Sequence, residues 1–342
     1  MVELNGKKIL VTFLMHLGDL TLTTPFIHAL RKAAPDAHIT MLVDEKLKDV
    51  VLFNPYLDEV VTIDKKGRDN SILSLWACSR HLSKLDFDVL INLHPNERCS
   101  FIDAMTNVKL RTGTTHKIFK WFWDVFTPLD RSMHAADMYL DVLQQLGVQN
   151  LSNNGLEIFP GEEHFLEAEL FWQEQNITDQ DKLIGFNIGS AVPTKRWPPE
   201  RFAEVADIFA AKGYKTVFFG GPMDEEMVAE ATGYMQTRPI IATGHFAIGG
   251  LAAAMRRCCL IITNDSGPMH VAISQKVPIV AMYGPSNPKL YGPYTKDAVI
   301  VTAQPPCQGC ADGMKHSCDD LQCMSRMTVE QVVAAAEKML EK

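Results

Sequence analysis

The chain has 342 residues and a formal net charge of −8. Soluble domains usually hold about 100–200 residues, so this length favours two domains. Hydrophobic residues make up 46% and charged residues 22%, which is typical of a globular protein with enough apolar side chains for two cores. The acidic balance argues against a general nucleic-acid binder, which would carry a basic surface.

The beginning of the chain leads directly into an apolar, strand-like stretch. It lacks the long apolar core and the cleavage site of a signal peptide. No apolar run approaches the roughly 18 residues that are needed to cross a bilayer. We therefore expect a cytoplasmic protein, whose contact with a membrane could only be peripheral.

The first half of the chain alternates strand-like and helix-like segments. An apolar strand is expected at Lys8–Leu14, followed by a Gly-Asp turn and a helical stretch from about residue 23 to residue 33. The further strands are expected at 37–43, 59–63 and 87–93. Such alternation indicates parallel βαβ units. A polar region, residues 150–181, contains one amphipathic helix and is the best candidate for a linker between the halves.

The second half repeats the alternation more clearly. Strands are expected at 183–188, 215–219, 240–242, 259–263 and 278–283. Helices are expected at 199–212, from about 224, at 248–257 and at 329–341. Two open α/β sheets in series follow from this pattern, and such sheets bind ligands beyond the carboxyl ends of their strands. The residues that carry chemistry should therefore come directly after strands.

The segment Asn264–His270 (Asn-Asp-Ser-Gly-Pro-Met-His) is the clearest such loop. It follows an apolar strand, and Pro268 can open a helix at its first turn. The free N–H groups and the dipole of that helix would suit a phosphate, and Gly267 allows close approach of the backbone. The alternative is that Asp265 or Ser266 merely caps the helix.

This loop resembles the D-[ST]-G-x-x-H signature of the lipopolysaccharide heptosyltransferases, glycosyltransferase family 9. Further segments resemble other motifs of that family and follow in the same order. The resemblance spans nearly the whole chain and is weakest between about residues 65 and 180. The further segments are Leu17-Gly18-Asp19 with the following Pro25, residues 190–198 with Lys195 and Trp197, residues 220–226 with Asp224, and Tyr283-Gly-Pro-Ser286.

The resemblance implies a GT-B architecture, two Rossmann-like α/β domains that face a central cleft. It places an acceptor-binding domain at 1–165 and a nucleotide-sugar-binding domain at 166–326. A C-terminal helix at 327–342 could pack back on the N-terminal domain. The implied reaction transfers heptose from ADP-L-glycero-D-manno-heptose with inversion at the anomeric carbon.

Inverting transfer needs a base that removes a proton from the acceptor hydroxyl. The family's catalytic aspartate matches Asp19, which follows the first strand. A helix cap is the structural alternative for this residue. Gly18, Lys109 and Arg111 are the other residues that we expect on the acceptor side.

The departing ADP develops negative charge, which cations and N–H dipoles would stabilise. Lys195 is the best cation, His270 could contact phosphate or sugar or be structural, and Asp224 could accept hydrogen bonds from donor hydroxyls or cap its helix. No divalent metal is required, no cofactor is expected, and no D-x-D metal motif lies between the halves. The expected donor-binding residues are Ser190, Lys195, Asp224, Asp265, Ser266, Gly267, Pro268, Met269 and His270.

Residues 109–131 form a basic, aromatic segment, with five Lys or Arg against two Asp in an otherwise acidic protein. Such a segment can lie at an anionic membrane surface, which would suit a phosphorylated glycolipid acceptor. The alternative is an ordinary helix that buries its aromatic side chains in the core.

Four cysteines crowd together as Cys307-x2-Cys310-x7-Cys318-x4-Cys323. The number fits a structural zinc site, but the second pair lacks the close spacing of C-x2-C, so free thiols remain the other interpretation. The remaining four, Cys78, Cys99, Cys258 and Cys259, are expected to behave as small buried hydrophobic residues.

The sequence thus predicts an inverting, metal-independent heptosyltransferase whose partners are ADP-heptose and the lipopolysaccharide inner core, at the inner face of the inner membrane. A family relative with another sugar nucleotide or acceptor, a GT-B sugar-nucleotide 2-epimerase and a non-catalytic nucleotide-sugar binder are the alternatives. Asp19 argues against the binder, because pure binding needs no base.

Overall fold

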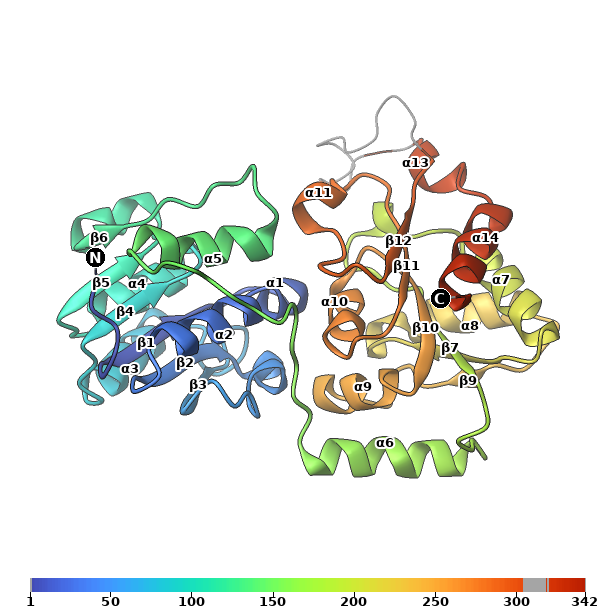
Figure 1. Ribbon diagram of the computed structural model, residues 1–342, viewed down its shortest axis with the longest axis horizontal. Helices are drawn as coiled ribbons and strands as arrows, with labels where there is room; N and C mark the ends of the chain where they lie inside the picture. Colours follow the sequence, from blue (N-terminus) through green and yellow to red (C-terminus); the bar gives the residue numbers. More distant parts are fainter. Residues whose placement is uncertain (1, 304–317, 319, 342) are drawn as a thin grey trace. The chain divides into compact units, whose positions relative to one another are not determined.

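The structure is a computed structural model that describes residues 2–303, 318 and 320–341 (Figure 1). The chain divides into two compact units, Met1–Phe159 and Pro160–Lys342. The division lies a few residues before the expected one, because helix α6 (Glu162–Glu174) packs against α9 (Ile248–Met255) of the second unit.

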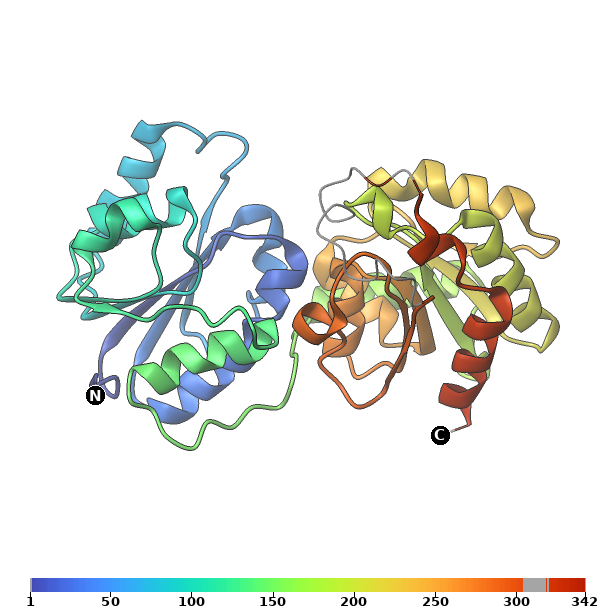
Figure 2. The ribbon, with the colours of Figure 1, turned by 90° about the horizontal axis from the view of Figure 1, so that it is seen from above.

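The first unit is built on a six-stranded parallel sheet in the order β3-β2-β1-β4-β5-β6. Helices cover both of its faces, with α2 and α5 on one side and α3 and α4 on the other (Figure 2). The central strands are therefore buried almost throughout, as is usual for parallel sheets. The strands are β1 (Lys8–Thr12), β2 (His38–Asp44), β3 (Glu59–Ile63), β4 (Val89–Asn92), β5 (Leu110–Gly113) and β6 (Val125–Phe126).

The helical stretch expected near residue 23 is preceded by a separate short helix. Helix α1 (Leu17–Thr21) comes first, and α2 (Thr24–Ala33) carries Pro25 in its first turn. Proline lacks the N–H that would continue one uninterrupted helix, which accounts for the break. The other helical elements are η1 (Glu45–Val50), α3 (Ile72–Ser83), α4 (Glu97–Met105), η2 (Lys117–Phe122) and α5 (Ala135–Gln145), where η marks a 3-10 helix.

The second unit repeats the design with a six-stranded parallel sheet in the order β12-β11-β10-β7-β8-β9. Its strands are β7 (Leu183–Asn187), β8 (Lys215–Phe219), β9 (Ile240–Ile241), β10 (Cys258–Asn264), β11 (Ile279–Met282) and β12 (Ala298–Val301). Its other helical elements are η3 (Pro193–Lys195), α7 (Pro199–Ala211), η4 (Pro222–Asp224), α8 (Glu225–Tyr234), α10 (Gly267–Ser274), α11 (Pro288–Tyr291), α13 (Gln322–Ser325) and α14 (Val329–Leu340).

The C-terminal helix α14 belongs to the second unit. It begins with a capping box in which Thr328 and Gln331 exchange hydrogen bonds. Its apolar face, with Val332 and Ala336, joins the core formed by α7 and strands β10, β11 and β12. The apolar face of α14 is therefore buried within its own unit.

Each sheet is the doubly wound type in which the strand order reverses beside the first strand, β1 in one unit and β7 in the other. Fully buried polar side chains stand at the carboxyl ends of the strands beside these points. They are Thr12, Asn92, Asn187 and Asn264. Among the described residues, no helix is long and apolar enough to cross a membrane.

Candidate active site

The loop after β10 leads directly into helix α10, as the sequence predicted. Ser266 is the residue before the first turn, and Pro268 lies within that turn. The Ser266 side chain does not cap the helix, because its Oγ accepts a hydrogen bond from Asn187 Nδ2 at 2.8 Å. The Asp265 carboxylate points to Lys195 instead. The arrangement therefore does not support the alternative that this motif is only a side-chain cap.

Lys195 and Asp265 form an ion pair at this edge of the sheet. Lys195 Nζ lies 2.7 Å from Asp265 Oδ2, and the two side chains are 14% and 7% exposed. Ser286 donates a hydrogen bond to the same carboxylate oxygen, and Ser190 Oγ lies 3.5 Å from the Asp265 carbonyl oxygen. Residues from three loops that are distant in sequence thus meet around one carboxylate.

Two buried asparagines tie these loops together. Asn264 donates to the Ile188 carbonyl at 2.7 Å and accepts from the Trp197 N–H at 3.1 Å. Asn187 donates to Thr263 Oγ1 at 3.1 Å as well as to Ser266. A buried amide must find such partners, so each asparagine fixes the loop that it contacts. Asn187 was given no role from the sequence, although a polar residue that ends an apolar strand could have indicated one.

Asp224 stands over the ends of β7 and β8. Its Oδ2 accepts a hydrogen bond from the Gly221 N–H at 2.9 Å. A Cβ atom at Gly189 would lie 2.1 Å from Asp224 Oδ1, and one at Gly220 would lie 2.9 Å from Asp224 Cβ. Only glycine at these two positions leaves room for the carboxylate. Asp224 makes no side-chain cap to α8, because its carboxylate bonds back to Gly221 at the start of η4.

The last two residues of the motif are buried within α10. Met269 is fully buried, and its sulfur lies 3.6 Å from the hydroxyl of Tyr283. His270 is only 4% exposed within α10. Asp265 and Ser190 of the same site are almost as buried, at 6% and 7% exposure, so contact of Met269 and His270 with the donor stays a prediction.

In the first unit, Gly18 and Asp19 lie in the first turn of α1, just beyond the end of β1. Both are half-buried. The loop that leads to them is held by Lys65, whose Nζ donates to the carbonyl oxygens of Leu14 at 3.1 Å and Met15 at 2.9 Å. The same ammonium lies 3.1 Å from Asp44 Oδ2. Lys65 therefore uses its three N–H groups to fix the segment that presents Asp19.

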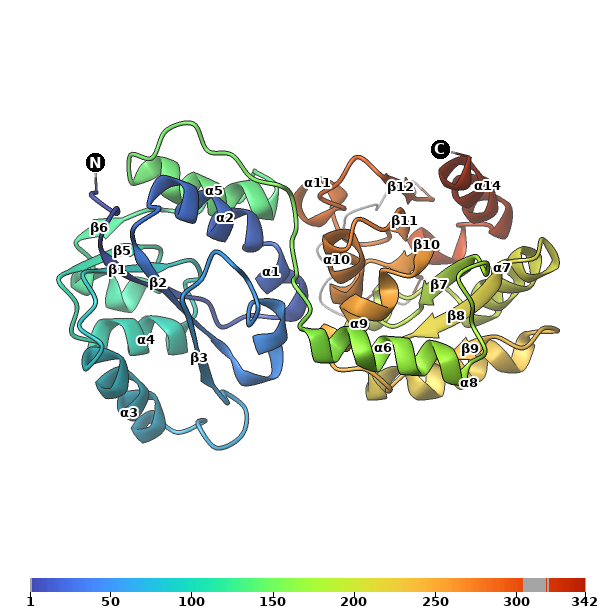
Figure 3. The ribbon, with the colours of Figure 1, turned by 60° about the horizontal axis from the view of Figure 1, so that its bottom comes forward.

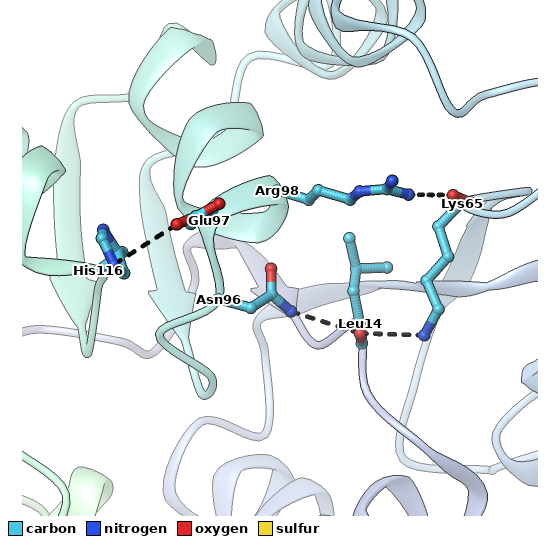
Figure 4. Close-up of a pocket in the computed structure, with 6 residues that line it drawn as sticks. All are labelled: Leu14, Lys65, Asn96, Glu97, Arg98 and His116. Atoms are coloured by element: carbon cyan, nitrogen blue, oxygen red, sulfur yellow. Dashed lines mark hydrogen bonds and ion pairs between the residues drawn. The ribbon is translucent and has the colours of Figure 1, made fainter.

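A pocket of about 390 Å³ opens beside this loop (Figure 4). Figure 4 shows His116 at one end of the pocket and Lys65 at the other, with the Arg98 guanidinium directed to the Lys65 carbonyl. His116 Nε2 lies 3.9 Å from Glu97 Oε1, and Asn96 Nδ2 lies 3.4 Å from the Leu14 carbonyl. None of these residues was assigned a role from the sequence, and they follow four different strands, β1, β3, β4 and β5.

Two residues expected on the acceptor side lie elsewhere. Lys109 pairs with Asp88 at 2.7 Å, and Asp88 also accepts from the N–H of Lys8, the first residue of β1. Lys109 is therefore at the amino end of the sheet, opposite Asp19. Arg111 donates to the Asp103 and Thr106 carbonyl oxygens and so closes the C-terminus of α4. Lys109 and Arg111 thus both have structural partners within the first unit.

Beneath the site, a buried carboxyl group links the ends of β1 and β4. Asp103 Oδ2 accepts hydrogen bonds from Thr12 Oγ1 at 2.9 Å and Asn92 Nδ2 at 2.5 Å. Asn92 Oδ1 accepts in turn from the His94 N–H at 2.6 Å. Burial raises the pKa of Asp103 to about 7, although the hydrogen bonds from Thr12 and Asn92 lower it.

The basic, aromatic segment 109–131 is not a helix that buries its aromatic residues. It forms β5, η2 and β6, and only Trp123 of its aromatic side chains is buried, with its Nε1 donating to the Thr112 carbonyl at 3.0 Å. Trp121 is 95% exposed and Ile118 is 59% exposed. The alternative of an ordinary core helix was therefore wrong.

The cysteine cluster is only partly described. Cys307 and Cys310 lie outside the described residues, while Cys318 is half-buried and Cys323 is buried. Cys99 and Cys258 are buried free thiols as expected, whereas Cys78 and Cys259 are half-buried. Within the described part of the chain, no group of three or more His, Cys, Asp or Glu side chains is arranged to hold a metal ion.

The comparisons with known proteins agree with this geometry. The family model described as glycosyltransferase family 9 (heptosyltransferase) matches residues 75–318, which is well over half of the chain. The chain belongs to glycosyltransferase family 9. It is therefore a glycosyltransferase, and its two Rossmann-like α/β units are those of the GT-B class.

Similar proteins span the full length of this family member. A solved family 9 glycosyl transferase from Veillonella parvula DSM 2008 is 53% identical, covers 99% of each chain and has a TM-score of 0.95. Lipopolysaccharide heptosyltransferase 3 of Escherichia coli (strain K12) is 24% identical, over 94% of this chain and 95% of its own. The solved E. coli ADP-heptose lps heptosyltransferase II is 21% identical over 98% of each chain with a TM-score of 0.81, a likeness of fold.

Proposed function

We propose that this family 9 enzyme transfers heptose from ADP-L-glycero-D-manno-heptose to the lipopolysaccharide inner core, with inversion at the anomeric carbon. Family membership supports a glycosyl transfer reaction. Binding of the nucleotide-sugar donor by the second unit is supported by the Lys195–Asp265 pair beside the first turn of α10. An ammonium group next to a helix N-terminus that its own side chains leave uncapped suits a diphosphate.

The donor-binding residues of the second unit would stabilise the departing ADP. As the bond between the anomeric carbon and the diphosphate oxygen breaks, the electron pair goes to that oxygen and ADP departs. Lys195 and the N–H groups at the start of α10 would stabilise this charge. Asp265 holds the Lys195 ammonium in position before the donor binds, and Ser286 holds the Asp265 carboxylate. Little reorganisation is therefore needed during the reaction. Asp224 would accept hydrogen bonds from hydroxyl groups of the donor.

Asp19 would act as the general base of the acceptor half. Its carboxylate takes the proton from the acceptor hydroxyl while that oxygen attacks the anomeric carbon from the side opposite the diphosphate. One displacement forms the new glycosidic bond and breaks the old one, which inverts the configuration. The hydrogen bonds of Lys65 to the Leu14 and Met15 carbonyls would hold the loop before Asp19, and with it the Asp19 carboxylate, in a fixed position.

The pocket beside this loop would receive an anionic acceptor. Arg98 and His116 supply positive or protonatable groups, and Glu97 could accept hydrogen bonds from sugar hydroxyls. Carboxylate or phosphate groups on an inner-core sugar match the guanidinium of Arg98. Such an acceptor is anchored in lipid, so we propose that transfer takes place at the inner face of the inner membrane.

A donor screen tests this proposal. Thermal shift is measured with ADP-heptose, ADP, UDP sugars and GDP sugars, and product formation is followed with ADP-heptose and an inner-core acceptor. We expect stabilisation by ADP and ADP-heptose, and turnover that persists after EDTA treatment, because Lys195 and α10 replace a metal. Stabilisation confined to UDP sugars would overturn the heptose assignment. Release of UDP and an epimerised free sugar without acceptor would identify a 2-epimerase.

A further inference from the structure

Two groups of exposed apolar side chains project from the first unit. Ile72, Leu73 and Trp76 lie on the first turns of α3 and are 72%, 77% and 52% exposed. Ile118, Trp121 and Phe122 lie on η2 and are 59%, 95% and 45% exposed. Single exposed apolar residues are common, but large ones gathered on neighbouring elements mark an interaction site.

The two groups lie on the same side of the sheet and at its carboxyl edge. Helix α4 contacts both α3 and η2, and Figure 3 shows α3 and α4 side by side. Helix α3 and η2 both begin at the carboxyl edge, where β3 and β5 end. The pocket beside the Asp19 loop adjoins both groups. Its His116 precedes η2, and its Arg98 bonds to Asn70, two residues before α3.

Basic residues accompany both groups in a chain of net charge −8. Residues 64–84 contain five Lys or Arg against two Asp. The Arg80 guanidinium lies 6.0 Å from the ring centre of Trp76, and Lys120 Nζ lies 4.5 Å from that of Phe126. Lys117 is also exposed. Exposed Trp, Phe, Leu and Ile next to Lys and Arg match an anionic lipid surface, where the rings enter the interface and the cations meet the headgroups.

We propose that these six apolar residues, with Arg80, Lys117 and Lys120, form a docking surface for an anionic lipid bilayer. Docking would place the pocket at the membrane plane, where the headgroup of a lipid-anchored acceptor lies. That consequence for the reaction rests on the proposed function, whereas lipid binding itself does not.

Vesicle binding tests the docking surface without reference to turnover. Sedimentation with phosphatidylcholine vesicles is compared with and without phosphatidylglycerol, at low and at high salt. We expect binding to the anionic vesicles that weakens as salt rises. Leu73→Ser with Trp121→Ser should reduce binding by about tenfold or more, because two large apolar side chains no longer leave water. Lys117→Glu with Lys120→Glu should reduce it on anionic vesicles only.

Matched controls separate the docking surface from general stickiness. Leu166→Ser with Leu170→Ser removes two exposed apolar residues of α6 in the second unit, which are 56% and 51% exposed. Lys32→Glu with Lys296→Glu makes the same charge change at two other exposed lysines. Both controls should bind as the unmodified protein does. All four variants change exposed residues, so unfolding temperatures should stay close to that of the unmodified protein.

Three outcomes would overturn the proposal. They are absence of binding to anionic vesicles at low salt, equal loss in the controls, and unchanged binding in both docking-surface variants. Light scattering adds a further check, since a dimer that Leu73→Ser with Trp121→Ser dissociates would assign the surface to a second copy of the chain. Turnover with a short, water-soluble acceptor should stay normal in these variants, so failure of docking is distinguishable from failure of the transfer reaction.

Discussion

Lys195 Nζ lies 2.7 Å from Asp265 Oδ2, and this pair joins the loop after β7 to the loop after β10. Both side chains are largely shielded from water, so each charge depends on the other for compensation. The pair holds the ammonium beside the first turn of α10 before any ligand arrives. The cation proposed to bind the diphosphate is thus fixed by a carboxylate of the same motif.

Replacement of Lys195 should affect both stability and ligand binding. We expect Lys195→Ala to lower the free energy of unfolding by roughly 2 kcal/mol, less than the ~3–5 kcal/mol of a fully buried pair because some solvent reaches the ammonium. ADP affinity should fall about tenfold or more, measured by calorimetry. Lys212→Ala is the control, since it removes an exposed pair with Glu337 in the same unit. Unchanged ADP affinity in Lys195→Ala would end its assignment to the diphosphate.

Asp19→Asn tests the proposed base. The amide keeps the size of the side chain but cannot take a proton, so turnover should fall by about 10²–10⁴-fold while fold and donor affinity persist. Asp86→Asn is a matched control, an exposed aspartate of the same unit with φ of 54°, a conformation that Asn tolerates. Near-normal turnover in Asp19→Asn would remove Asp19 from this role.

Lys65→Met should act on the reaction through the loop that presents Asp19. Loss of the hydrogen bonds to Leu14 and Met15 loosens that loop, so we expect kcat to fall while ADP affinity in the other unit stays constant. Lys66→Met is the neighbouring control, because Lys66 is exposed. The kcat of both variants is measured with a water-soluble acceptor. Equal values in the two variants would contradict a positioning role for Lys65.

Gly189→Ala tests whether Asp224 must stay over the strand ends. The added methyl group would lie 2.1 Å from Asp224 Oδ1, so the carboxylate has to move. Donor affinity should therefore fall, as measured by calorimetry with ADP-heptose. Gly233→Ala, in helix α8 with open space around it, should instead leave binding unchanged and slightly stabilise the protein. Normal donor affinity in Gly189→Ala would show that Asp224 does not contact the donor.

Asp103 should make the stability of the protein depend on pH. Its pKa is raised from an ordinary 3.8 to about 7 by burial, so the unfolded chain loses this proton at lower pH than the folded one. The folded state binds more protons between these values, and its stability therefore falls as pH rises through that range. The Asp103→Asn side chain cannot ionise. The free energy of unfolding of this variant, relative to that of the unmodified protein, should therefore rise by about 1.4 kcal/mol per pH unit from pH 4 to 7.

Denaturant unfolding at several pH values measures this difference. Asp86→Asn serves again as the control, since removal of an exposed carboxylate should leave the slope close to that of the unmodified protein. A parallel pH dependence in Asp103→Asn and the unmodified protein would show that Asp103 does not titrate in this range.

Strands with their own apolar signal were predictable. The expected bounds of β3 and β8 are those of the structure, and the other expected strands differ only at their ends. Strands β5 and β6 were not identified, because β5 carries Arg, Thr and Gly and β6 has only two residues. Strand β12 was missed although its residues, Ala-Val-Ile-Val, are apolar. The short helix α1 was also missed, since five residues carry no helical period.

The sequence by itself determined the alternation of strands and helices, the motifs of family 9 and the position of those motifs after strands. These are local properties, set by hydrophobic period and by glycine and proline. Only the tertiary structure decided which side chains meet. It paired Lys195 with Asp265, fixed the Asp19 loop with Lys65, turned Met269 inward, and left Trp121 exposed while burying Trp123 two residues away. Such contacts depend on neighbours supplied by other strands, which local sequence does not specify.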